Sequence, residues 1–243
     1  MAGHSKWSNI KHKKGKADAA RGNLFTKIGR EISVAVKQGG ADPVSNSRLR
    51  DVIAKAKQAN MPNDNINRSI KKASGELDNI HYEEVVYEGY GPNGVAIIVE
   101  ALTDNRNRTA GEVRHAFDKH GGSLGQTGCV GYMFNRKGVI VADKTMSDED
   151  MMLLALEIEA DDIVIDDEVY EIYVSPSDVF DKAEQLENAG AVILNKAVDM
   201  VPDNYITPEN QETLVKLINA LEDSDDVQNV YHNAELEEEE EEE

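Results

Sequence analysis

The chemistry this sequence offers most clearly is the neutralisation of phosphate by lysines and arginines near its first residue. Residues 1–40 carry nine Lys and Arg residues, opposed only by Asp18 and Glu31. Lysine ammonium groups bind phosphates without fixed geometry, so a glycine-loosened arm can follow a groove or enter a crevice of a nucleic acid. A solvated tail is the alternative. The residues predicted to contact nucleic acid are His4, Ser5, Lys6, Trp7, Lys11, His12, Lys13, Lys14, Lys16, Arg21, Lys27, Arg30 and Lys37.

Trp7 is the single tryptophan, and it lies among lysines rather than in an apolar stretch. A base could stack on its ring, which is worth about 1–3 kcal/mol in proteins that bind single strands. The ring could equally pack on the helix that follows it. Both interpretations stay open.

Two further groups of cations are predicted as secondary phosphate contacts. Arginines beside the free amides of a helix start can bind phosphate. They can also cap the helix or bond to another domain, which we favour slightly for the group near residue 106. The two groups are Arg48, Arg50, Lys55 and Lys57, and then Arg106, Arg108 and Arg114.

The charge is divided unevenly along the chain. Residues 1–80 hold sixteen basic and seven acidic residues, whereas the remainder holds ten basic and thirty-nine acidic ones, for a net charge of −20. Such asymmetry indicates nucleic-acid or membrane contact by the basic part. No run approaches the roughly 18 apolar residues that span a bilayer, so we expect a bacterial cytoplasmic protein without a membrane partner.

No pattern of residues indicates catalysis. The single Cys129 excludes a disulfide framework or a four-thiolate metal site, and the six histidines are scattered without an HExxH motif. We therefore predict no catalytic residue, no metal, no cofactor and no small-molecule substrate. An enzyme built around Arg106, Arg108 and His115 is the weakest hypothesis.

Hydrophobic periodicity predicts a three-helix unit at the start of the chain. Residues 24–39 place apolar side chains at helical spacing, a second helix follows Asp42-Pro43, and a short third helix starts at Pro62. Lys27, Arg30 and Lys37 are expected on the face of the first helix that points away from this unit. The residues expected on its inner face are Leu24, Phe25, Ile28, Ile32, Ala35 and Val36.

The rest of the chain alternates between strands and helices. Residues 84–90 and 95–102 read as a hairpin about Gly91-Pro92-Asn93-Gly94, a helix begins at Thr109 with capping-box spacing to Glu112, and residues 132–134 read as a strand. Residues 137–201 follow the order β-α-β-β-α-β of ferredoxin-like domains. A helix over 208–221 and a strand over 227–232 have no neighbouring partners, so we expect them to return to the earlier sheet.

These elements predict an α+β multidomain protein: an N-terminal three-helix domain plus two α/β-sandwich (ferredoxin-like) domains, the last inserted into the middle one. The expected boundaries are 1–76 for the basic helical domain with its mobile arm, 82–135 plus 205–233 for the middle domain, and 137–201 for the inserted domain. The acidic residues 234–243 are expected to form a disordered tail.

The chain resembles the YebC/PmpR family of regulatory proteins over nearly its whole length. The resemblance is carried by the opening Ala2-Gly3-His4-Ser5-Lys6-Trp7, by Tyr87-Glu88-Gly89-Tyr90-Gly91-Pro92, by Asp104-Asn105-Arg106-Asn107-Arg108-Thr109 and by Val227-Gln228-Asn229-Val230-Tyr231-His232. It implies a cytosolic, non-enzymatic, three-domain protein without a special cofactor.

The resemblance leaves two functions open. The first hypothesis is a transcriptional regulator that binds promoter DNA through residues 1–72. The second is a ribosome-associated translation factor that binds ribosomal RNA or tRNA and relieves stalling at proline-rich stretches. A lysine arm with one aromatic suits irregular RNA, and no helix-turn-helix with a polar recognition face is evident in the sequence.

Overall fold

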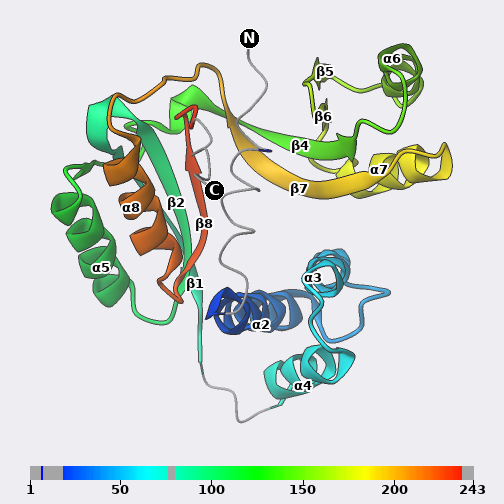
Figure 1. Ribbon diagram of the computed structural model, residues 1–243. Coiled ribbons are helices and arrows are strands. Elements are labelled where there is room, and N and C mark those ends of the chain that lie inside the picture. The colour runs from blue at the N-terminus through cyan, green and yellow to red at the C-terminus, as the bar shows by residue number, and fades with distance from the viewer. Residues whose placement is uncertain (1–6, 8–18, 76–79, 237–243) are drawn as a thin grey trace.

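The computed structural model describes residue 7 and residues 19–75 and 80–236. Figure 1 shows a three-helix unit below two four-stranded antiparallel sheets, each with helices on one face. The α+β multidomain fold predicted from the sequence is thereby confirmed.

The N-terminal unit consists of α2 (Ala19–Gly39), α3 (Ser47–Gln58) and α4 (Asn63–Ala73). Its core includes Ile28, Ile32 and Leu49, because apolar residues recur every three to four positions on each helix. The first helix starts five residues earlier than predicted, and Leu24 is 38% exposed rather than inward. The buried Asn46 caps α3 by accepting from the Leu49 amide and also donates to the Ala35 carbonyl, which locks the turn between α2 and α3.

The first sheet has the strand order β3-β1-β2-β8, with bounds β1 Glu83–Tyr90, β2 Ala96–Thr103, β3 Ser123–Leu124 and β8 Val227–His232. Helices α5 (Arg106–Lys119) and α8 (Gln211–Glu222) cover one of its faces (Figure 1) and enclose a core that includes Phe117, Leu214 and Leu217. The predicted hairpin is present, with the turn around Asn93 (φ 58°) and Gly94 (φ 76°). The last helix and strand return to this sheet, as expected.

The second sheet has the order β5-β6-β4-β7, with bounds β4 Phe134–Asp143, β5 Asp162–Ile165, β6 Val169–Val174 and β7 Ile193–Pro202. All of its strand pairs are antiparallel, which is the ferredoxin-like arrangement that the β-α-β-β-α-β order predicted. Helices α6 (Asp148–Glu157) and α7 (Val179–Asn188) pack on one face over a core that includes Ile140, Tyr170 and Leu186.

Two local predictions are wrong. Gly131–Met133 form a 3-10 turn, and β4 then runs without a break from Phe134, where two separate strands were expected. Helix α5 begins at Arg106 and is capped by Asn105, whose side chain accepts from the Arg108 amide. Thr109, the predicted cap, is instead fully buried inside the helix, because its hydroxyl is needed in a polar cluster described below.

The glycine-rich segment between β3 and β4 is ordered around one carboxylate. Glu88, only 6% exposed, accepts hydrogen bonds from the amides of Gly128 (2.8 Å), Val130 (2.9 Å) and Gly131 (2.6 Å). Burial would raise the pKa of Glu88, but the three amide donors lower it below its ordinary value. A tightly turned connection, not a phosphate loop, explains these glycines.

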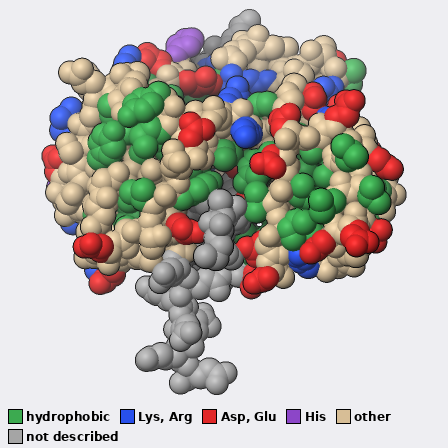
Figure 2. All heavy atoms as spheres, turned by 90° about the horizontal axis from the view of Figure 1, so that it is seen from above, with side chains coloured by type: hydrophobic (Ala, Val, Ile, Leu, Met, Phe, Trp, Pro, Cys, Tyr) green, Lys and Arg blue, Asp and Glu red, His purple; other side chains and the backbone are tan. Residues whose placement is uncertain are grey.

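The helix-free faces of the two sheets lie toward the interior of the molecule. On the first sheet, Ala96 and Ile98 pack with Val130 and Phe134 and so join it to the start of β4. Figure 2, seen from above, shows apolar side chains among acidic ones on the side of the second sheet. Met152, Leu153 and Leu156 of α6 are among the exposed apolar residues.

Candidate nucleic-acid interface

Trp7 lies against the helix-free face of the second sheet. Its amide donates to Glu171 Oε1 at 3.1 Å, and its indole Nε1 donates to Glu168 Oε2 at 2.6 Å. The half-buried ring packs on a cluster that includes Val139 and Tyr173. Of the two interpretations left open by the sequence, this geometry is that of a packing residue, although its partner is a sheet and not the helix that follows.

The other predicted contacts of the arm cannot be placed. His4, Ser5, Lys6, Lys11, His12, Lys13, Lys14 and Lys16 lie outside the described residues, as do residues 237–243 of the acidic tail. Arg21 lies in α2, but its side chain is not among those described.

Three predicted contacts on α2 bond within the protein. Lys27, 9% exposed, donates to the Glu222 carbonyl at 2.6 Å, and Arg30 donates to the Leu102 carbonyl at 3.3 Å and to Asp226. Lys37 donates to the Ile80 carbonyl. The face of α2 expected to be an outer surface is therefore an interface with the first sheet, because these cations satisfy carbonyls and a carboxylate at its edge.

Asp226 is the centre of this interface. Its side chain is 4% exposed, and it accepts from Thr109 (2.6 Å), Arg108 (2.7 Å) and Thr103 (3.3 Å) in addition to Arg30. Burial would raise its pKa, but hydrogen bonds from Thr109, Arg108 and Arg30 outweigh burial and lower the pKa to about 2. The carboxylate thus joins α2, α5 and the start of β8 at neutral pH.

The arginines near residue 106 have divided roles. Arg108 bonds to Asp104 and Asp226, which raises its pKa, so it serves the inter-domain bonding that the sequence analysis favoured. Arg106 and Arg114 are exposed on α5, as is His115. The three residues of the enzyme hypothesis therefore include one that is engaged in holding domains together.

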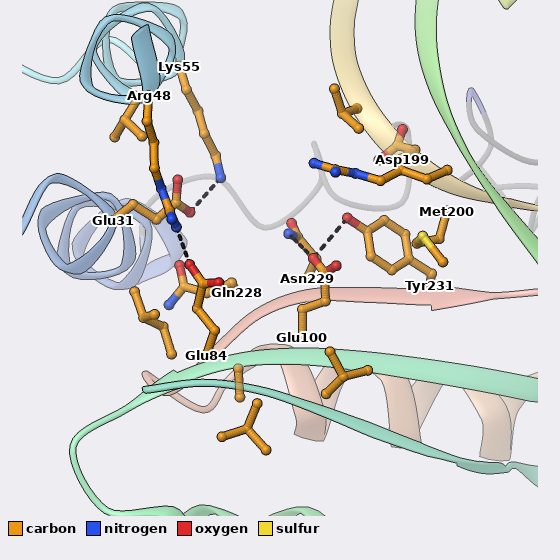
Figure 3. A pocket seen from close by; sticks show the side chains of 17 residues that line it. Glu31, Arg48, Lys55, Glu84, Glu100, Asp199, Met200, Gln228, Asn229 and Tyr231 are labelled. Atoms are coloured by element: carbon orange, nitrogen blue, oxygen red, sulfur yellow. Dashed lines mark hydrogen bonds and ion pairs between the residues drawn. The ribbon is translucent and has the colours of Figure 1, made fainter. Parts of the chain in front are cut away.

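Arg48 and Lys55 line an acidic cleft of about 570 Å³ between α2, α3, the first sheet and β7. Figure 3 shows Arg48 pointing to Glu84 and Lys55 to Glu31, where the ammonium group lies 2.6 Å from the carboxylate. Across the cleft, Glu100 accepts from Asn229 and Tyr231. Four carboxylates line this space, so it is a poor phosphate site.

The outer surfaces of α3 and α4 carry the cations that remain available. Arg50 and Lys57 of the predicted set are exposed there, and neither makes an ion pair or side-chain hydrogen bond with a described residue. Three more cations on α4 share these properties and were not singled out from the sequence: Arg68, Lys71 and Lys72. The inward spacing of Ile66, Ile70 and Ala73 was the signal that places them outward. We call these five cations the outer basic surface.

Two classes of site have no support among the described residues. They hold no group of three or more His, Cys, Asp or Glu side chains placed to bind a metal ion. In the same part of the chain, no helix combines the length and the apolar character needed to cross a membrane.

Taken together, the fold and this surface define a three-part α+β protein in which a basic helical unit is attached to two α+β units rich in acidic residues. Residues 5–76 match the family described as "TACO1/YebC protein N-terminal domain", and residues 82–234 match "TACO1/YebC second and third domain". The chain belongs to the TACO1/YebC family, and the family predicted from the sequence is confirmed.

Relatives of this family align over nearly the whole chain. A "Probable transcriptional regulatory protein" of Acetivibrio thermocellus is 60% identical over 238 residues, covering 96% of this chain and 98% of the relative. One of Clostridium tetani with the same name is 55% identical over 243 residues, covering 98% and 99%. The crystal structure of the conserved hypothetical protein Aq1575 from Aquifex aeolicus superposes with a TM-score of 0.83 at 48% identity, covering 98% of this chain and 100% of that one.

Proposed function

We propose that this protein regulates gene expression by binding nucleic acid through its helical N-terminal unit, with promoter DNA as the first candidate target. The observation that carries the proposal is the outer basic surface on α3 and α4. The names of the relatives support a regulatory role. Nucleic acid is the macromolecular partner that such a surface fits, because its phosphates release counterions when cations neutralise them.

The contrast between the two sets of cations supports this choice of surface. Lys27, Arg30 and Arg108 are already bonded to carbonyls or carboxylates of the protein, so a phosphate would have to displace those partners. Arg68 and Lys71 have no such partner among the described residues. The acidic remainder of the chain repels phosphate, so it orients the nucleic acid toward this one surface.

Ribosomal RNA or tRNA is the second candidate target. Helices α3 and α4 have 12 and 11 residues, so each presents a surface only about 17 Å long. So short a surface between acidic units contacts little of a straight duplex but fits a bend or a single-stranded loop of RNA. A ribosome-associated role follows from this alternative.

The test is a double variant, Arg68→Gln with Lys71→Gln, and its charge-matched control is Lys119→Gln with Lys216→Gln on α5 and α8. Binding of the full chain to a labelled DNA duplex and to a structured RNA is followed by fluorescence anisotropy at several salt concentrations. The first variant is expected to weaken binding and to flatten the log–log salt dependence for the duplex by about 0.9 per lost phosphate contact. Equal affinity of the two variants would refute the proposed surface.

Crosslinking and sequencing in cells separates the two targets. Enrichment of promoter fragments supports the DNA target, and dominant recovery of ribosomal RNA or tRNA replaces it with the second candidate. Recovery of neither, with no binding in vitro, would overturn nucleic-acid binding altogether.

A further inference from the structure

A second, smaller groove lies between α2 and α4, where the chain approaches β1 (Figure 1). Its volume is about 310 Å³. Phe25 of α2 and Tyr82, just before β1, supply aromatic wall on one side, and both rings are half-buried. Lys72 and Ser69 of α4 supply polar groups on the other. The groove is therefore aromatic at one side and cationic at the other.

The chemistry of this groove differs from that of the acidic cleft in Figure 3. None of the described residues that line it is Asp or Glu, although 46 of the 243 residues of the chain are acidic. Arg30 lies with its guanidinium 5.5 Å from the centre of the Tyr82 ring, which fixes that ring while the same guanidinium bonds to Asp226. The wall of the groove is thus tied to the inter-domain contacts and held in place.

Two polar groups in the groove remain available for a ligand. Neither the Lys72 ammonium nor the Ser69 hydroxyl makes a hydrogen bond or ion pair with a described residue. They are three residues apart on α4 and so lie on the same side of that helix. Gly29 opens the floor between the helices, since its missing Cβ would lie 3.7 Å from Ser69 Oγ.

We propose that this groove binds one unpaired nucleotide, whose base lies against Phe25 and Tyr82 and whose phosphate is bound by Lys72 and Ser69. A flat aromatic ring joined to a phosphate is the ligand that matches an aromatic wall opposite an ammonium and a hydroxyl. The volume lies at the lower end of the roughly 300–1,000 Å³ found for small-ligand sites, so it admits one nucleotide and excludes a base pair. The proposal deepens the proposed function and rests on it, because Lys72 also belongs to the outer basic surface.

The experiment compares single strands with duplexes on the full chain. Phe25→Leu removes the aromatic ring but keeps an apolar side chain in the core, and Lys72→Gln removes the ammonium. The charge-matched comparison is Lys71→Gln, which lies next to Lys72 but outside the groove. Anisotropy is measured with a short single strand and with the duplex of the same sequence, and a thermal melt checks that each variant folds.

Phe25→Leu is expected to weaken single-strand binding by about five- to a hundredfold, as loss of one stacked base does, and to leave duplex binding unchanged. Lys72→Gln is expected to weaken the single strand more than Lys71→Gln does, whereas the two weaken the duplex alike. Titration with a nucleoside monophosphate and with inorganic phosphate then assigns the source. Saturable binding of the monophosphate alone indicates a free nucleotide, and binding only of the strand indicates a nucleotide within it.

The outcomes separate this inference from the proposed function. If single strands bind and Phe25→Leu has no effect, the nucleotide site is wrong while nucleic-acid binding stands. If Phe25→Leu does not fold, equal losses for Lys72→Gln and Lys71→Gln with the single strand still overturn the site. If the unmodified protein binds no polynucleotide, the proposed function fails as well.

Discussion

Replacement of Asp226 by Asn is expected to loosen the attachment of the helical unit to the first sheet. The substitution preserves the size of the side chain but removes the charge that Arg30 and Arg108 share. Arg30, 16% exposed, would then be a buried cation without a counterion, which is costly. The pair with Arg108, which is 43% exposed, is screened by water and contributes little.

The size of the effect follows from the pKa of Asp226. The shift from its ordinary value of 3.8 to about 2 corresponds to roughly 2 kcal/mol of stabilisation at neutral pH. Because the folded-state pKa is depressed, this stabilisation is complete above pH 4, roughly half remains at pH 3, and it disappears as the pH falls through about 2. In a chain of this size, it corresponds to a fall in melting temperature of about 4–8 °C.

The measurement is the free energy of unfolding from urea titrations at pH 7 and pH 3, with Asp225→Asn as the control. Asp225 is the exposed neighbour in the same turn, and it makes no ion pair or side-chain hydrogen bond with a described residue. Asp226→Asn should lower the stability at pH 7 and do so less at pH 3, while Asp225→Asn does neither. Identical behaviour of the two variants would refute the role assigned to the buried carboxylate.

Three further perturbations test separate parts of the fold. Glu88→Gln should lower the free energy of unfolding by about 2 kcal/mol, because three backbone amides lose a charged acceptor, whereas Glu83→Gln on the exposed end of the same strand should change it little. Asn105→Ala should cost about 1 kcal/mol by circular dichroism melts and Glu112→Ala almost nothing; the opposite order would favour the capping box at Thr109. Trp7→Ala should lower the stability of the second sheet by about 2 kcal/mol in calorimetry, and an unchanged transition would show that the packed ring contributes nothing.

Strand and helix types could be predicted from the sequence because they depend on local periodicity. The strand over 227–232 and the strand over 169–174 have the bounds that the pattern predicted, and the order of elements after residue 137 sufficed for the ferredoxin-like topology. The return of the last helix and strand followed from their lack of local partners. The start of α5 was misplaced, because Asn105 and Thr109 are both plausible caps, and only packing against Asp226 decides between them.

The candidate site could be predicted only in part, for a related reason. The sequence by itself determined that the N-terminal part is basic and the remainder acidic, since charge is a property of composition. Which cations are available was decided by tertiary structure, because α2 turns Lys27 and Arg30 toward carbonyls and a carboxylate that lie about 70 to 200 residues away. Distant backbone groups leave no periodic signal in the neighbourhood of a lysine, so their pairing becomes visible only when the chain is folded.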